Sequence, residues 1–472
     1  MSEAAPPPQP QGPAAIEQSL YEVRHKIHPR AVTGWFATWR WSLVWFTQLL
    51  FYGLCWLPWN GRQAVLFELA ERKFYIFGLI FWPQDVFYLA ILLIVAAYSL
   101  FLFTAIGGRL FCGYACPQTV YTEIFLWIER KIEGDRHARI KLDDAPLSAH
   151  KLGLKAAKHG AWIAVALWTG FTFVGYFTPI RTLASEVLSL SLGPWETFWV
   201  LFYGFATYGN AGWMREQVCK YMCPYARFQS VMFDPDTLIV TYDAKRGEPR
   251  GSRSKKADYK AEGKGDCVDC GICVQVCPTG IDIRDGLQYE CIGCSACIDA
   301  CDQVMDKMHY PRGLIRYSTE NALLKNWGRK EILGHILRPR IMIYGAILVL
   351  IIAAAAAGLA SRQPLKVDVI RDRGTLEREE DDGMIENSYR LQIMNVSETA
   401  HRYTIGVSGL NGIEVEHQRI VEIPAATTHS VVVEVHAPPE SGKKGFNRIY
   451  FEISAVDDAK IAVREPASFL LP

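Results

Sequence analysis

The sequence lacks a net charge of either sign. Its 50 Lys and Arg residues face 49 Asp and Glu residues, which leaves a formal charge of +1 at pH 7. Domains that bind nucleic acid usually carry a clear basic excess. We therefore expect no nucleic-acid partner.

Charged side chains are also missing from five apolar stretches that approach or reach the length of a membrane-crossing helix. They are 41–61, 86–106, 160–180, 197–214 and 341–360, of which the fourth is the shortest. Such runs are rare in soluble proteins. The sequence therefore predicts five transmembrane helices in a lipid bilayer.

None of these stretches contains a histidine, and His159 only touches the edge of the third. An intramembrane haem needs axial ligands there, commonly His, so no haem is expected. A Gly-rich fingerprint after a strand is also missing, since Gly107 and Gly108 mark a helix end. Flavin is therefore not expected, and the electron donor should be another protein or a quinol.

The first thirty residues lack the apolar core of a signal peptide and are rich in Pro, Ala and Gln. We expect residues 1–34 to be a disordered tail and the first span to be an uncleaved anchor. Nine Lys and Arg residues lie in 107–159, against three in 62–85 and one in 181–196. The positive-inside rule then makes the N-terminus, 107–159 and 215–340 cytoplasmic and exports the C-terminal domain. Twelve of the thirteen cysteines lie on that cytoplasmic side, and none follows residue 301.

Eight cysteines form two consecutive runs with the spacing C-x2-C-x2-C-x3-C, the bacterial ferredoxin pattern. In that pattern the fourth cysteine of each run binds the other cluster. One 4Fe–4S cluster is therefore assigned to Cys267, Cys270, Cys273 and Cys301. The second is assigned to Cys291, Cys294, Cys297 and Cys277.

The main rival for closely spaced cysteines is zinc, whose sites use cysteine pairs rather than doubled triplets. Asp302 stands where the second run would normally have proline, which suggests a looser turn after Cys301. Clusters of this type carry single electrons, so the pattern indicates an electron carrier or a redox enzyme.

A motif R-x2/3-C-x3-C-P occurs twice, at 109–117 and 215–224, after the second and fourth spans. The spacing places each cysteine pair on one helical face, and the prolines should end or kink the helix. If the two hairpins pack together, four thiols converge: Cys112, Cys116, Cys219 and Cys223. Such soft ligands suit Cu(I) or another iron–sulfur centre, whereas buried structural thiols or a reversible disulfide are the alternatives. Arg109 and Arg215 would either stabilise thiolates or anchor at headgroups.

Composition predicts the domains of a multi-domain membrane protein. Residues 35–233 form a four-helix membrane domain, 234–264 a basic linker, 265–312 the ferredoxin domain, 313–340 a connector and 341–360 the fifth helix. Within the linker region a short strand is expected at 238–242, and 243–266 is expected to be flexible. The linker is a solvated tether or a contact with anionic headgroups.

Alternating patterns in 361–472 predict an all-β immunoglobulin-like sandwich. Its strands are expected at 365–371, 388–396, 401–407, 413–420, 430–435, 448–454 and 460–464. Four histidines lie among them without fixed ligand spacing, which is typical of surface residues rather than metal ligands: His401, His417, His429 and His436.

Taken together, these motifs resemble the FixG/CcoG (RdxA) family of cytochrome oxidase accessory proteins. The segments 21–30 with Gly34, 72–78 and 81–85 are similar to that family's signature segments. Both C-x3-C-P motifs, both ferredoxin runs and the immunoglobulin-like end also match.

The resemblance implies a bacterial inner-membrane protein with a periplasmic C-terminal domain, needed for assembly of cbb3-type cytochrome c oxidase. It also implies reduction of Cu(II) to Cu(I), with copper ions and a copper chaperone or oxidase assembly factors as partners. Copper contact or relay would fall on Cys112, Cys116, Cys219 and Cys223. Because about 30 Å of hydrocarbon separates the clusters from the exported face, reduction is expected at the cytoplasmic side.

Two alternatives remain open on the sequence. The chain could be a membrane-anchored ferredoxin that relays electrons from a quinol to a partner reductase without any role for copper. It could also be an assembly scaffold whose clusters are structural.

Overall fold

The computed structural model describes residues 26–255, 257–371, 378–379, 383–416 and 420–472. The chain divides into two compact units. The first unit comprises 1–47, 100–167 and 204–341, and the second comprises 48–99, 168–203 and 342–472. Most of the expected N-terminal tail and His417 lie outside the described residues.

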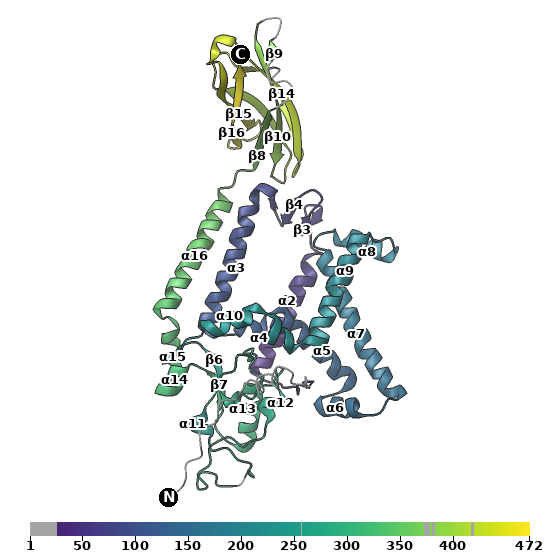
Figure 1. Cartoon of the computed structure of the whole chain (residues 1–472), viewed down its shortest axis with the longest axis vertical. Coiled ribbons are helices and arrows are strands. Elements are labelled where there is room, and N and C mark those ends of the chain that lie inside the picture. Colours follow the sequence, from purple (N-terminus) through teal and green to yellow (C-terminus); the bar gives the residue numbers. More distant parts are fainter. Residues whose placement is uncertain (1–25, 256, 372–377, 380–382, 417–419) are drawn as a thin grey trace, which may run out of the picture. The chain divides into compact units, whose positions relative to one another are not determined.

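All five apolar stretches fall on helices, which Figure 1 labels α2 (Trp35–Leu54), α3 (Val86–Gly107), α7 (Ala149–Val174), α9 (Pro194–Thr207) and α16 (Pro339–Ala360). Among the described residues, two helices are long and apolar enough to cross a membrane, Pro83–Gly107 and Pro339–Ala360. Only 0% and 6% of their apolar windows are buried, so neither is the core helix of a soluble domain. These helices indicate a membrane protein.

The other three helices differ from the expected spans for physical reasons. Helix α9 has 14 residues, which reach about 21 Å at 1.5 Å per residue, and it continues as the π-helix η2 (Tyr208–Met214). Helix α2 contains Arg40 and ends at Leu54, before the last residues of the expected span. Helix α7 carries three lysines in its first half. Five crossings therefore remain a prediction.

The first unit holds both cysteine motifs and the ferredoxin module. Short helices surround the motifs: α4 (Leu110–Tyr114), α5 (Pro117–Glu133), α6 (Arg136–Asp144), the π-helix η3 (Val218–Met222) and α10 (Pro224–Met232). The module contains α12 (Ile272–Gln275), the 3-10 turn η4 (Ile283–Asp285) and α13 (Ala296–Met308). Strand β6 (Ile239–Tyr242) pairs antiparallel with β7 (Ile315–Ser318), and Val240 and Ile315 are buried in the module core. Strands β6 and β7 lie before and after the expected domain bounds of 265–312, so the ferredoxin domain extends beyond both ends of that range. Helices α14 (Glu320–Lys325) and α15 (Arg329–Ile336) follow it.

The short strand expected at 238–242 is strand β6. The described residues after it, which the composition indicates as a flexible linker, contain the helical turn α11 (Ala244–Gly247) and pack on the ferredoxin module. Arg246 bonds Asp266 at 2.5 Å, and the Tyr259 ring lies 4.5 Å from the ring of Tyr310. The composition suggested solvated basic side chains, whereas Arg246 and Arg253 donate hydrogen bonds to the module.

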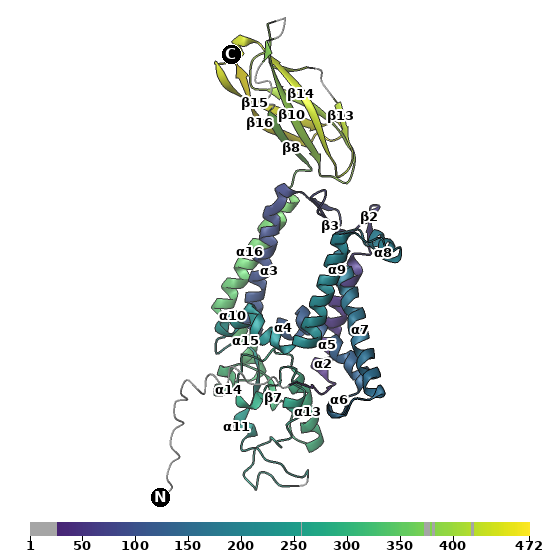
Figure 2. The same cartoon turned by 45° about the vertical axis from the view of Figure 1, so that its right-hand side comes forward.

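In the second unit, α3 and α16 lie side by side, as Figures 1 and 2 both show. The rings of Tyr98 and Tyr344 are 5.9 Å apart. The unit also contains α8 (Ile180–Leu188), the hairpin β1 (Pro58–Trp59)–β2 (Arg62–Gln63), and a three-stranded sheet, β3 (Val65–Glu68), β4 (Lys73–Ile76) and β5 (Leu79–Phe81), which is followed by η1 (Pro83–Asp85).

The C-terminal region is a sandwich of two antiparallel sheets, as expected (Figure 1). One sheet has the order β12 (Glu414–Val415), β14 (Thr428–Ala437), β10 (Ile385–Asn395) and β8 (Leu365–Arg371), with β9 (Arg378–Glu379) also paired to β10. The other has the order β13 (Ile420–Ile423), β11 (His401–Ser408), β15 (Gly445–Ala455) and β16 (Ala462–Leu471), and η5 (Pro439–Ser441) precedes β15. The buried rings of Tyr389, Tyr403, Phe451 and Phe469 fill the core between the sheets.

The three-stranded sheet packs against this sandwich. Tyr75, Ile80 and Trp82 form one buried cluster with Met394 and Val396 of the sandwich. Buried Asp85 pairs with Arg362 and Lys366, and Glu398 pairs with Arg62 at 2.6 Å. The segments 72–78 and 81–85, noted in the sequence for their family resemblance, therefore hold the sandwich.

Candidate electron-transfer site

The two ferredoxin loops repeat one backbone conformation. In the first loop Asp269 and Gly271 flank Cys270 with φ of +51° and +63°. In the second loop Gly293 and Ser295 flank Cys294 with φ of +67° and +61°. This left-handed conformation bends the chain sharply around each central cysteine. Because Gly271 and Ser295 are also the N-caps of α12 and α13, each loop leads directly into a helix.

Each set of four cysteines assigned from the spacing gathers around its own small cavity. The first cavity is lined by Cys267, Cys270, Cys273 and Cys301 together with apolar residues such as Met305 and Leu314. The second is lined by Cys277, Cys291, Cys294 and Cys297 together with Ile281 and Ile292. Cys273 borders both cavities, so the two sites are neighbours. Four thiols with apolar walls fit the ligation of a 4Fe–4S cluster by four cysteines.

The electrostatic surroundings of the thiols agree with this grouping, in which the fourth cysteine of each run lies with the first three of the other run. Burial raises the pKa of Cys294 to about 12, and the thiols of Cys277 and Cys291 raise it further, against the charge of Arg40, which lowers it. Burial likewise raises the pKa of Cys301 to about 12, with contributions from Cys273, Cys267 and Cys270. A cluster that binds these buried thiols must displace their protons. Within the described residues, no three Cys, His, Asp or Glu side chains are close enough to hold a single metal ion.

The turn after Cys301 is not loose. Cys301 and Asp302 both lie inside α13, and Asp302 accepts a hydrogen bond from the Gly313 amide at 2.9 Å. A proline at 302 would remove a helix hydrogen bond, whereas aspartate lets the helix continue.

The two C-x3-C-P motifs share a geometry that differs from the expected single helix. Cys116 and Cys223 are extended N-cap residues, and Pro117 and Pro224 occupy the first turn of α5 and α10. Proline suits that position because its missing N–H has no partner there. The prolines therefore start new helices, and each cysteine pair straddles a break. Cys112 lies in α4 and Cys219 in the π-helix η3.

The two motifs nevertheless meet. Burial raises the pKa of Cys112 to about 12, and both Cys116 and Cys219 lie near enough to raise it further. Cys219 is likewise influenced by Cys116 and Cys223. The Cys112 thiol lies 3.3 Å from Gln229 Oε1 on α10, and the Arg109 guanidinium donates to the Ala226 carbonyl.

The arginines of the two motifs have different surroundings. Burial raises the pKa of Cys112 to about 12 and that of Cys219 to about 11, and the charge of Arg109 offsets part of this rise. Arg215 adopts a left-handed φ of +43° and pairs with Glu129 at 2.7 Å. Both side chains are buried, with 5% and 7% exposed, so neither anchors at a headgroup.

The first motif lies directly against the second cluster loop. A Cβ atom on Gly113 would come within 2.8 Å of the Gly293 carbonyl and 2.9 Å of the Cys294 backbone. The Tyr114 hydroxyl lies 3.2 Å from Ser295 Oγ, which itself lies 2.8 Å from the Tyr317 hydroxyl. From α2, Arg40 donates to the Cys294 carbonyl at 2.5 Å. These contacts fix the loop of the second site beside the Cys112 helix.

A buried ion network that the sequence analysis missed supports this arrangement. Glu129 pairs with Arg139 at 2.9 Å and Arg215 at 2.7 Å, and Lys158 lies 3.8 Å away. Lys158 also pairs with Glu133 at 3.1 Å. Two acidic residues one helical turn apart on α5 were the available signal, but their partners come from distant segments.

Comparison with known proteins agrees with this description. The family described as "4Fe-4S dicluster domain" matches residues 214–320, and "4Fe-4S binding domain" matches 89–134. The family described as "IG-like fold at C-terminal of FixG" matches 355–472. Cluster loops, apolar helices and these matches define an iron–sulfur electron-transfer protein of the membrane, with oxidoreductase-like character.

The chain belongs to the FixG/RdxA family. It is 40% identical over 428 residues to the nitrogen fixation protein FixG of Rhizobium meliloti, covering 84% of this chain and 82% of that protein. It is 38% identical to protein RdxA of Cereibacter sphaeroides, covering 90% and 92%. Protein RdxB of the same organism is also 38% identical, with 88% and 90% covered.

Proposed function

We propose that this protein passes single electrons from two 4Fe–4S clusters to a four-thiol site, where Cu(II) is reduced to Cu(I) for assembly of cbb3-type cytochrome c oxidase. The four thiols are Cys112, Cys116, Cys219 and Cys223. The observation that supports this most directly is the close approach of Gly113 to the backbone of Cys294. It brings the chain between two of the thiols against the loop of the second cluster.

The chemistry of the thiol site suits this reaction. When bound, the clusters supply electrons one at a time. Each Cu(II) ion would become Cu(I) by taking up one electron from a cluster held at the ferredoxin cysteines. Soft thiolates favour the Cu(I) product over Cu(II), which prefers nitrogen and oxygen ligands. Burial raises the pKa of Cys112 and Cys219 and Arg109 opposes part of that rise, so an ion that binds there would displace the thiol protons.

The proposed setting is the bacterial inner membrane, crossed five times. Five crossings follow from the uncharged stretches and the basic 107–159 segment. They put the clusters and the thiol site in the cytoplasm and the sandwich in the periplasm. Copper reduction would then occur inside, before the ion reaches a chaperone or an oxidase assembly factor.

The test uses anaerobically purified full-length protein reduced with dithionite and freed of excess reductant. Added Cu(II) should reoxidise the clusters, and Cu(I) should appear in a chelator assay at one ion per electron. A Cys112→Ser/Cys219→Ser variant should retain iron but reoxidise at least tenfold more slowly. Cys55→Ser is the matched control, since Cys55 is a buried thiol outside both motifs. Equal rates in all three proteins would refute the thiol site.

A second candidate is a third cluster at the four thiols, favoured by the match of a 4Fe–4S binding family to 89–134. Iron analysis separates the two, because two clusters give about eight irons per chain and three give about twelve. A third cluster also predicts that Cys112→Ser/Cys219→Ser lowers the iron content.

If a Cys267→Ser/Cys291→Ser variant still supports oxidase activity in cells, the clusters are structural and the protein is a scaffold.

A further inference from the structure

A cavity of about 100 Å³ lies beside the second cluster loop within the first unit. Its walls come from 29–32, from α2 and α5, and from the cluster loop at Ile292 and Cys294. Cys219 of the second thiol motif borders it too. A ligand held here would touch the segments that carry the second cluster.

The wall carries more basic than acidic side chains. The lining includes two carboxylates, Glu123 and Glu216, against five arginines: Arg30, Arg40, Arg130, Arg139 and Arg215. Arg139 and Arg215 are paired with Glu129, and Arg30 is exposed, so the positive excess of the wall is modest. The buried Nε of Arg139 has no hydrogen-bond partner in the described part of the chain. Within the described residues no three Cys, His, Asp or Glu side chains gather here, so the lining suits a neutral or anionic ligand better than a metal ion.

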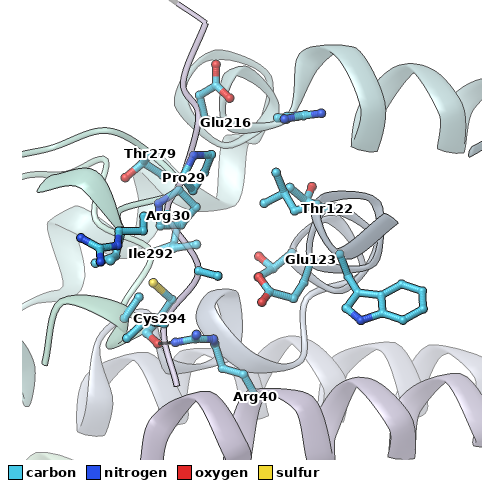
Figure 3. Close-up of a pocket in the computed structure, with 18 of the residues that line it drawn as sticks. Pro29, Arg30, Arg40, Thr122, Glu123, Glu216, Thr279, Ile292 and Cys294 are labelled. Atoms are coloured by element: carbon cyan, nitrogen blue, oxygen red, sulfur yellow. Dashed lines mark hydrogen bonds between the residues drawn. The ribbon is translucent and has the colours of Figure 1, made fainter. Parts of the chain in front are cut away.

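Glu123 stands apart from the paired carboxylates nearby. It forms no salt bridge within the described residues, although Glu129 and Glu133 of the same helix are both paired. Figure 3 shows its carboxylate reaching from α5 toward the middle of the cavity, with Cys294 across from it and Arg40 bonded to the Cys294 backbone. A proton acceptor thus faces the cluster loop across the space.

The surroundings favour a lipophilic ligand. Trp41, Leu126 and Trp127 line the cavity together with Ile292. On the same helix as Trp41, large side chains are exposed: Trp35, Trp39, Trp45 and Phe46 at 69%, 51%, 62% and 61%. Exposed aromatic residues of this kind are typical of a membrane interface. A ligand dissolved in the bilayer would reach the cavity from there.

We propose that this cavity binds a membrane quinol and that Glu123 accepts its proton, so that the quinol is the electron donor of the protein. This inference rests on the proposed electron-transfer function. In each of two successive steps one O–H bond of the quinol breaks, the proton goes to Glu123 and one electron would enter the cluster that Cys277, Cys291, Cys294 and Cys297 would hold. That cluster takes one electron at a time, so the first electron would pass to the neighbouring cluster at Cys267, Cys270, Cys273 and Cys301 before the second step. Glu123 releases the first proton to water before the second step. Overall one quinol becomes one quinone, two protons are released and two electrons enter the clusters.

Binding is tested first, without turnover. Full-length protein in lipid nanodiscs is irradiated with a photoactivatable short-chain quinone, and the labelled peptides are identified by mass spectrometry. The label should fall on α5 around Trp127 or on α2 around Trp41, and unlabelled quinol should compete with it. Leu126→Trp, which fills the cavity, should lower the labelling at least tenfold.

Electron entry is tested next by cluster bleaching under anaerobic conditions. Glu123→Gln keeps the shape of the side chain but removes the proton acceptor. It should retain labelling and slow quinol-driven cluster reduction about 100-fold, the usual range for a general base. Its reduction by dithionite should be unchanged. Glu320→Gln, an exposed carboxylate on α14, is the matched control and should behave as the unmodified protein.

Several outcomes would overturn the inference. Labelling confined to other peptides, or labelling displaced by anionic lipid vesicles and not by quinol, would make this a headgroup site. Wild-type rates in Glu123→Gln would exclude its role, even if Leu126→Trp fails to fold. Failure of the copper reaction is separate, because dithionite-reduced protein tests copper reduction without any quinol.

Discussion

At the scale of single residues, the charges buried around the second cluster loop are the features with the clearest consequences. Arg40 is 7% exposed, and its guanidinium donates a hydrogen bond to the Cys294 carbonyl. A fixed positive charge next to a cluster favours the reduced, more negative state.

Arg40→Ala should therefore lower the reduction potential of the second cluster by several tens of millivolts. Redox titration followed by EPR measures this shift. Arg40→Lys keeps the charge and should restore most of the potential. Equal potentials in all three proteins would show that Arg40 only ties the loop to α2.

Glu129 is the second such residue, since it neutralises Arg139 and Arg215 in a site that is 1% exposed. Burial by itself raises the pKa of Glu129, but the nearby Arg215, Arg139 and Lys158 outweigh it and lower the pKa overall. Because the pKa of Glu129 is lowered on folding, its carboxylate stabilises the folded state fully at pH values above the ordinary pKa of glutamate. This stabilisation is lost only as the pH falls through the lowered value.

Glu129→Ala should cost about 3–5 kcal/mol of unfolding free energy, because it leaves two buried guanidinium groups without their carboxylate. Thermal denaturation of the solubilised protein would reveal a large drop in Tm. Asp306→Ala, which breaks the exposed pair with Arg312, is the control and should change little. A similar Tm for both variants would contradict the importance of the network.

At the scale of elements, the ferredoxin module caps a helix that lies far from it in sequence. The Asp299 carboxylate on α13 accepts hydrogen bonds from the Phe36 and Ala37 amides at 3.2 and 2.7 Å. These are free N–H groups of the first turn of α2. A side chain on Gly34 would overlap Asp299, which gives the glycine its structural reason.

Asp299→Ala should remove this cap at a cost of about 1 kcal/mol and loosen the start of α2. Hydrogen exchange should then become faster at Phe36 and Ala37. Asp302→Asn on the same helix keeps its own acceptor for Gly313 and should leave these amides unchanged. Unaltered exchange in Asp299→Ala would mean that packing alone holds the helix start.

Local patterns predicted elements well and their ends poorly. The alternation at 365–371 became β8 with the same bounds, but 413–420 became parts of β12 and β13, which belong to different sheets. Alternation shows which face is buried and not which sheet a strand joins. Strand β16 runs to Leu471 past Pro466, because it lies at a sheet edge where proline is tolerated.

At the candidate site, too, local sequence patterns predicted some features and missed others. Spacing assigns the eight ferredoxin cysteines to two sets, and each set lines one of two neighbouring cavities, with Cys273 at both; the ligation itself stays a prediction. Spacing did not show that Cys116 and Cys223 precede helices, because C-x3-C fits a helical face equally well. The contacts of Glu129, Asp299 and Gly113 join segments remote in sequence, and no local pattern marks such partners.

At the scale of the whole molecule, the number of membrane crossings is the main prediction that is open to test. Five crossings require residue 141 and residue 443 to lie on opposite sides. Lys141→Cys and Lys443→Cys place thiols at two exposed positions. In spheroplasts an impermeant thiol reagent, read by peptide mass spectrometry, should label position 443 before lysis and position 141 only afterwards. Labelling of both positions before lysis would indicate an even number of crossings between residues 141 and 443, instead of the expected three.

The packing of the three-stranded sheet on the sandwich determines what happens when a protease cuts the chain between them. The sandwich is joined to α16 by a single stretch of polypeptide near residue 362. It is also held by noncovalent contacts with Trp82, Asp85 and Arg62. A protease that nicks the chain at 361–364 would therefore leave two fragments that co-purify. Separation on a denaturing gel, with co-elution under native conditions, would be the signature of that second attachment.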